Sequence, residues 1–302
     1  MTWLKYFLFS LLLLLAVPLL VRAQNRPISA TADTTVAQRV EILNYTRTLT
    51  FQTVDDTTRL TIIAGDVKLR QGSNLFYCDS CVINNNTNVF EAWGRQVHIN
   101  DSDTADIYAN HLRYFMKRKV AFLDGNVKMT DGNGTLTTPD LEYDMETNLG
   151  IYRNGGRVVN GKTELTSREA WYYADMKDVY FKGNVVLKDP AYDMNTDSLL
   201  YNTESKTTRF ISQTIITDSS GRVIKTKEGY YNQLTGKAEF GQNPEIKDGE
   251  TSIRARSIRM DDSTGISIAE GNAIIQDTKN GTTIIGGIVM RNTKTDAILR
   301  SE

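Results

Sequence analysis

The heptapeptide LDGNVKM, residues 123–129, contains the two features that decide the fold of this chain. A Gly-Asn pair stands directly before an apolar residue, and polar and apolar residues alternate from Asn126 to Met129. Alternation with a period of two is typical of a β-strand that has one buried and one solvated face. Glycine readily adopts the positive φ angles of turns. The stretch therefore predicts a turn that is followed by a half-buried strand.

The same arrangement recurs along the chain with a period of about 30 residues. One marker is an apolar residue shortly after a glycine or another turn residue, at residues 65–67, 96–97, 125–127, 156–158, 183–185, 214–215, 243–244 and 272–273. A second marker is a large apolar residue, one spacer and usually tyrosine, at residues 75/77, 112/114, 141/143, 171/173 and 199/201, with related forms as far as residue 290. Two independent markers with one spacing identify an internal repeat.

The repeat indicates the class of fold. Each unit has room for two or three short antiparallel strands, which cannot bury their apolar face alone, whereas stacked copies can. The 21 glycines and only 5 prolines suit many short strands joined by tight turns. We therefore predict an all-β domain over residues 40–302, an elongated twisted β-jelly roll or solenoid-like sandwich of about nine repeats of about 30 residues.

The N-terminus has the parts of a secretory signal peptide. Lys5 precedes an almost wholly apolar stretch, residues 6–20, and Val21-Arg22-Ala23 supplies a small-residue cleavage site. An uncleaved membrane anchor is the alternative, but the apolar stretch is shorter than the ~20 residues that a spanning helix needs. We predict a cleaved signal peptide over residues 1–23, export, and a flexible polar lead-in over residues 24–39.

Cys78 and Cys81 form a C-x-x-C pair. Redox pairs of this spacing lie at the N-terminus of a helix in a βαβ unit, whereas strand-like segments flank these two cysteines. We interpret them as two small buried residues of a turn, which oxidation after export could join in a local disulfide. A redox function remains the alternative.

Few other residues indicate chemistry. His98 and His111 fall in different strands, so we expect solvated or hydrogen-bonded imidazoles and no metal ligands. Residues 101–106 resemble a calcium loop but lack the glycine and the closing glutamate of an EF-hand, which favours a polar turn. The sequence has no nucleophile elbow, P-loop or dinucleotide fingerprint. We expect no enzyme, metal or cofactor, and the net charge of −1 argues against a nucleic-acid partner.

A continuous apolar interior has two uses. Either the protein's own side chains fill it and the molecule is a structural rod or cell-envelope scaffold, or the sheets leave a groove for acyl chains. A glycan-processing β-solenoid would instead need a recurring pair of exposed carboxylates, which the repeats lack. The alternation points one set of side chains inward as candidates for lining a lipid groove: Val67, Leu69, Val97, Ile99, Val127, Met129, Leu141, Tyr143, Val185, Leu187, Leu199 and Tyr201.

The ordered recurrence of the short motifs in residues 89–94, 123–127, 136–144 and 180–187 resembles the OstA-like family, from about residue 40 to the end of the chain. That family is similar to LptA, the periplasmic component of lipopolysaccharide transport, and to the N-terminal periplasmic domain of LptD. The resemblance implies a twisted β-jelly roll whose interior shields the acyl chains of lipid A.

The resemblance also implies a place and partners. The expected location is the periplasm, in association with the outer membrane, and the expected cargo is lipopolysaccharide. The expected protein partners are transport components in the inner and outer membranes and further copies of the chain in head-to-tail contact. A non-catalytic structural β-solenoid without lipid cargo is the alternative.

Overall fold

The computed structural model describes residues 39–101, 105–295 and 297–301. The expected signal peptide, residues 1–23, and the expected lead-in, residues 24–39, lie outside the described residues except for Arg39. Strands form nearly all of the described chain, and its one helical element is a single 3-10 turn, η1 (Ala174–Met176). None of the described residues belongs to a helix that is long and apolar enough to cross a membrane.

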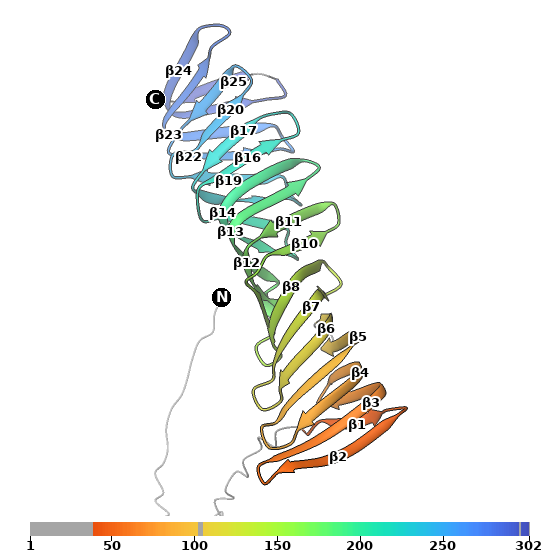
Figure 1. The fold of residues 1–302 in the computed structure, drawn as a ribbon. Coiled ribbons are helices and arrows are strands. Elements are labelled where there is room, and N and C mark those ends of the chain that lie inside the picture. The colour runs from red at the N-terminus through yellow and green to blue at the C-terminus, as the bar shows by residue number, and fades with distance from the viewer. Residues whose placement is uncertain (1–38, 102–104, 296, 302) are drawn as a thin grey trace, which may run out of the picture. The chain divides into compact units, whose positions relative to one another are not determined.

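The strands follow one another in chain order, from orange at β1 and β2 to blue at β24 and β25 (Figure 1). Their bounds are β1 (Glu41–Asn44), β2 (Thr48–Asp55), β3 (Thr58–Gln71), β4 (Asn74–Asn84), β5 (Val89–Asp101), β6 (Ala105–Phe115), β7 (Val120–Thr130), β8 (Thr135–Asp144), β9 (Leu149–Tyr152), β10 (Gly156–Asn160), β11 (Thr163–Ser167), β12 (Glu169–Tyr173), β13 (Asp178–Asp189), β14 (Tyr192–Asn202), β15 (Thr207–Phe210), β16 (Thr214–Asp218), β17 (Val223–Thr226), β18 (Glu228–Asn232), β19 (Lys237–Gly241), β20 (Glu245–Asp248), β21 (Thr251–Arg254), β22 (Ser257–Asp261), β23 (Ile266–Asp277), β24 (Thr282–Asn292) and β25 (Ala297–Ser301).

The long strands take part in two ladders at once. In β13, residues 178–182 pair with β12, and after a break in register residues 186–188 pair with β11. All pairings are antiparallel, and the same break recurs in β3, β5, β7 and β23. The strand segments therefore form two layers. Layer A contains β1, β10, β11, β16, β17, β20 and β21, together with those segments of the long strands that belong to the same ladder. Layer B contains β2, β9, β12, β15, β18, β19, β22 and β25, together with the other segment of each long strand.

The break in register is a β-bulge with positive φ angles. In β7, Gly125 has φ +76° and Asn126 has φ +55°, and the Gly-Asx pairs of β3, β13 and β23 repeat this geometry. The Gly-Asx markers were therefore correct in position, but their interpretation as turns was wrong, because these four pairs lie inside continuous strands. The marker at residues 243–244 does lie in a connection, between β19 and β20. A bulge of this kind bends the strand and increases its twist, which lets one strand pass from one layer into the other.

The two layers share one apolar interior. Side chains of both layers pack in each of two buried clusters, one of which extends from Ile63 to Met145 and the other from Tyr152 to Val289. Leu136 and Tyr172 pack against both clusters and so connect them. The prediction of an all-β sandwich of jelly-roll type is confirmed.

The bulge glycines can be tested with a matched pair of substitutions. Gly125→Ala adds a Cβ that would lie 2.9 Å from Asn110 Cβ, whereas Gly132 has nearly the same φ, +82°, and nothing within 4 Å of the added atom. An alanine in the left-handed region lowers the free energy of unfolding by about 1–2 kcal/mol in either variant. Crowding against Asn110 at the bulge lowers it by roughly 1–3 kcal/mol more in Gly125→Ala alone. Urea unfolding should therefore show a larger decrease in the free energy of unfolding for Gly125→Ala than for Gly132→Ala. Equal decreases would contradict the assigned role of the bulge.

Candidate functional site

All twelve candidate groove residues lie in the interior. Each is at most 5% exposed. Those from Val67 to Tyr143 belong to the first cluster, and Val185, Leu187, Leu199 and Tyr201 belong to the second. Burial is what a filled core and an acyl-chain site both require of these side chains, so their role in binding stays a prediction.

The layers meet differently on their two sides. On one side the backbone joins them, through the bulges of the long strands and through short loops such as residues 153–155 and 211–213. On the other side the hairpin turns of the two layers approach one another, and we call this second side the mouth. Tyr114 of layer B donates a hydrogen bond across the mouth to Gln71 Oε1 of layer A, at 2.6 Å. Gln71 Nε2 in turn donates to the carbonyl oxygen of Met116, at 3.4 Å.

Two further tyrosines make the same connection. Tyr143 Oη donates to Asp101 Oδ2 at 2.7 Å, and Tyr172 Oη donates to Asp131 Oδ2. Each tyrosine is the next-to-last residue of a strand in layer B, and each acceptor ends a strand of layer A or directly follows one. We call this row of side-chain contacts across the mouth the seam.

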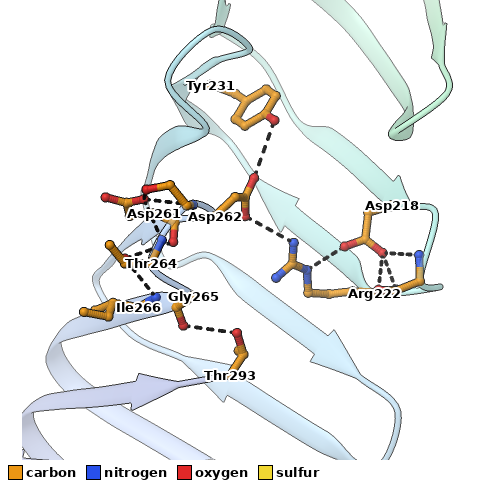
Figure 2. Close-up of polar contacts among 11 residues, drawn as sticks. Asp218, Arg222, Tyr231, Asp261, Asp262, Thr264, Gly265, Ile266 and Thr293 are labelled. Atoms are coloured by element: carbon orange, nitrogen blue, oxygen red, sulfur yellow. Dashed lines mark hydrogen bonds and ion pairs between the residues drawn. The ribbon is translucent and has the colours of Figure 1, made fainter. Parts of the chain in front are cut away.

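Toward the C-terminus the seam changes its chemistry. Gln233 Nε2 of layer B donates to Tyr192 Oη of layer A at 2.7 Å. Arg222 then forms ion pairs with Asp218 in its own turn, at 2.8 Å, and with Asp262 of layer B, at 3.8 Å (Figure 2). Arg291 of layer B lies 3.5 Å from Asp248 of layer A.

An apolar cavity lies beneath Arg222. Its volume is about 230 Å³, and its walls include Met194, Ile216, Ile224 and Phe240. Asp218, Arg222 and Asp262, which Figure 2 shows in contact, also line it. The interior therefore contains unfilled apolar space directly behind a polar seam.

The pKa values of two equivalent acids of the seam are shifted in opposite directions. Burial raises the pKa of Asp101 above its ordinary value, although the Tyr143 hydroxyl acts against the shift. Burial also acts to raise the pKa of Asp131, but hydrogen bonds from Tyr172 and from the N–H groups of Asn133 and Gly134 outweigh it and lower that pKa. The Asp131 carboxylate is therefore the better stabilised of the two.

The two cysteines do not lie in a turn, so that interpretation was wrong. Both belong to β4, where Cys78 pairs with Val67 and Cys81 pairs with Ile63 of β3, on either side of the break in register of that ladder. They are buried free thiols in the first cluster.

The histidines are hydrogen-bonded, as predicted. His98 Nε2 lies 2.8 Å from Asp106, and His111 Nδ1 lies 2.7 Å from Asp124. Residues 102–104 of the calcium-loop candidate lie outside the described residues. Within the described ranges, no group of three or more His, Cys, Asp or Glu side chains is placed to hold a metal ion.

Sequence reasoning found one half of the seam and missed the other. The second repeat marker contains Tyr114, Tyr143 and Tyr201, but at residues 171/173 it selected the wrong tyrosine, since Tyr172 makes the contact. The acceptors Gln71, Asp101 and Asp131 were missed. Their own spacing of about 30 residues was the signal that could have identified them.

The two seam acids should respond to pH with opposite signs. Because the folded-state pKa of Asp101 is raised from 3.8, its ionisation makes the folded state less stable as the pH rises through the window above 3.8. The folded-state pKa of Asp131 is lowered from 3.8, so its ionised carboxylate stabilises the folded state above pH 3.8. This stabilisation is lost as the pH falls through the folded-state pKa. Urea unfolding from about pH 3 to 7 gives the free energy of unfolding of the unmodified protein and of each variant. The excess of the unmodified protein over Asp101→Asn should fall with rising pH, whereas its excess over Asp131→Asn should rise. The same sign for both variants would contradict these assignments.

Comparisons with known proteins give one family and a distant structural likeness. A comparison with curated protein sequences gives no significant match. Among solved structures, the chain is similar to LptH of Pseudomonas aeruginosa, described as the LptA-homologous periplasmic component of its lipopolysaccharide transport device, with 16% identity, a TM-score of 0.33, and coverage of 37% of this chain and 80% of that chain. The model of the OstA-like protein family matches residues 37–197, more than half of the sequence, so this chain belongs to the OstA-like family.

Proposed function

We propose that this chain is a periplasmic lipopolysaccharide transport protein, whose interior shields the acyl chains of lipid A on the way to the outer membrane. Membership of the OstA-like family and the likeness to the periplasmic LptH support the transport role. The observation that best supports the shielding role is the seam, the row of side-chain contacts across the mouth. In the described part of the chain, side-chain contacts alone join the two layers at the mouth.

Such a mouth can open without unfolding the sheets. The backbone ladders run within each layer, so separating the layers along the seam breaks side-chain hydrogen bonds and ion pairs and leaves every ladder intact. A neutral side-chain hydrogen bond contributes about 0.5–1.5 kcal/mol, and one to a charged group about 1.5–3 kcal/mol. Each link is therefore weak enough to be broken singly.

The cargo supplies the driving force. Each exposed CH₂ group costs about 0.8 kcal/mol, so a chain of about twelve carbons gains roughly 10 kcal/mol when it leaves water for an apolar interior. This gain exceeds the cost of several seam links. An apolar interior closed by polar links therefore suits a lipid carrier, which needs no catalytic group.

Photo-crosslinking tests the shielding role. A photoreactive amino acid at Leu141 or Val185, which are 2% and 1% exposed, should label lipopolysaccharide, because these positions face the interior. The exposed positions Lys128, on the neighbouring strand β7, and Lys188, on the same strand as Val185, are the controls. Labelling is read as a mass shift on gels after irradiation of the folded, purified variants. Equal labelling at the inward and outward positions would leave the structural scaffold as the better description.

We also propose that copies of the chain, or other lipopolysaccharide-transport components of the two membranes, pair end to end with it. Within the described residues, β2 pairs with β3 alone, and its Phe51 and Val54 are 74% and 55% exposed. At the other end β25 pairs with β24 alone, and its Leu299 is 66% exposed. Unpaired edges with exposed apolar side chains favour strand addition.

A lysine on the β2 edge should weaken this pairing, because charge on an edge strand opposes strand addition. Phe51→Lys is expected to lower the weight-average mass in sedimentation at high protein concentration toward that of the monomer. Ile215→Lys is the control, since Ile215 is 39% exposed but lies on β16, which has partners on both edges. An unchanged mass for Phe51→Lys, or an equal fall for both variants, would argue against pairing through this edge.

A further inference from the structure

The seam follows two rows of the sheet register. In layer B, the cross-strand partners form one row in which a tyrosine occupies every second strand: Tyr114, Tyr143, Tyr172, Tyr201 and Tyr231. The strands between them carry small or β-branched residues in that row: Ala121, Gly150, Val179 and Thr208. Small neighbours leave each tyrosine ring room to extend toward layer A.

The row of acceptors in layer A has the same regularity. Gln71, Asp101 and Asp131 accept from the first three tyrosines, and they are followed by Asn160 at the end of β10. The separation of 41 residues between Asp131 and Tyr172 is also that between Asn160 and Tyr201. Asn160 and Tyr201 therefore occupy the positions of the fourth link.

That link is not made. Asn160 Nδ2 is buried and has no hydrogen-bond partner, and no hydrogen bond to Tyr201 Oη is found within the described ranges. Tyr201 itself is only 5% exposed. A buried donor without a partner is unfavourable, because it has lost its water and gained nothing in exchange. The seam thus has a gap between the Tyr172–Asp131 and Gln233–Tyr192 links.

An apolar cavity lies between this gap and the neighbouring Tyr172–Asp131 link, since Asn160, Asp131 and Tyr172 all line it. Apolar side chains of both layers form the rest of its wall, among them Leu136, Val158, Ala170 and Val179. It lies where the two buried clusters meet, since Leu136 packs against both. Its volume is about 50 Å³, so a chain that enters must push the layers apart. No hydrogen bond between Asn160 and Tyr201 has to be broken for the layers to separate here.

We propose that the Asn160–Tyr201 gap is the port through which an acyl chain enters the interior, and that Asn160 Nδ2 donates a hydrogen bond to the carbonyl oxygen of the ester or amide at the head of that chain. The inference rests on the proposed function. The apolar walls exclude sugars. The carboxylate of Asp131 on the same cavity disfavours an anionic head such as a free fatty acid, whereas a neutral carbonyl matches a neutral donor.

Closing the port by one substitution tests the inference. Asn160→Asp supplies the carboxylate that Asp131 offers to Tyr172, so Tyr201 should donate to it and complete the seam. Lipid A with a photoreactive acyl chain is the probe, and the rate at which it labels the interior of the folded full-length protein is measured. A hydrogen bond to a carboxylate should slow entry about tenfold. The double variant Asn160→Asp with Tyr201→Phe lacks the donor and should recover the original rate.

A second variant separates the port from the hydrogen bond. Asn160→Leu leaves the gap open, so entry should be unchanged, but loss of the donor should make bound lipid A dissociate about fivefold faster. Unchanged entry in Asn160→Asp, or a slowed rate that Tyr201→Phe does not restore, would overturn the port. Unchanged dissociation in Asn160→Leu would overturn the role of Nδ2. Failure of the unmodified protein to take up the probe at all would instead count against the proposed transport function.

Discussion

The Gly-Asx bulge is the constraint on which the arrangement of the chain depends. Because Gly125 and Asn126 both have positive φ, one strand leaves its ladder and enters another without a turn. Repetition of this bend in β3, β13 and β23, together with the short loops between the other strands, joins the two layers face to face along one side. At the opposite side, no backbone hydrogen bond joins the layers within the described residues. The bulge thus produces an interior that the backbone closes on one side only.

The other side is closed by groups that an apolar core would normally exclude. Asp101 is 5% exposed, and its raised pKa shows that burial disfavours its charge. A hydrogen bond from Tyr143 makes that burial tolerable and at the same time ties the layers together. Apolar side chains in these positions would give a tighter closure, but opening it would expose them to water. Polar links can exchange with water when they part, so their opening costs less.

The sequence predicted what depends on local period and missed what depends on the distance between the layers. Alternation placed Val67, Val127 and Val185 correctly in the interior, because a period of two fixes the face of a strand wherever the strand lies. It could not distinguish a turn from a bulge at Gly125, since both need positive φ. The acceptors of the seam could not be predicted for another reason. Their partners are 41 to 43 residues away in the opposite layer, and a local sequence pattern does not indicate which residues of the two layers face one another.

The repeat also explains how one residue can set the behaviour of the mouth. Every unit brings a layer A residue to the seam, and the backbone positions of Asp131 and Asn160 are equivalent within the repeat. The two differ in the contacts that they make. Asp131 accepts the Tyr172 hydroxyl and holds the layers together, whereas Asn160 makes no such link, although an amide oxygen can accept, as Gln71 Oε1 does from Tyr114, and its Nδ2 is left as a buried donor without a partner. The missing link in one unit therefore places the weakest point of the closure between the two clusters, where a chain that enters has apolar contacts on either side.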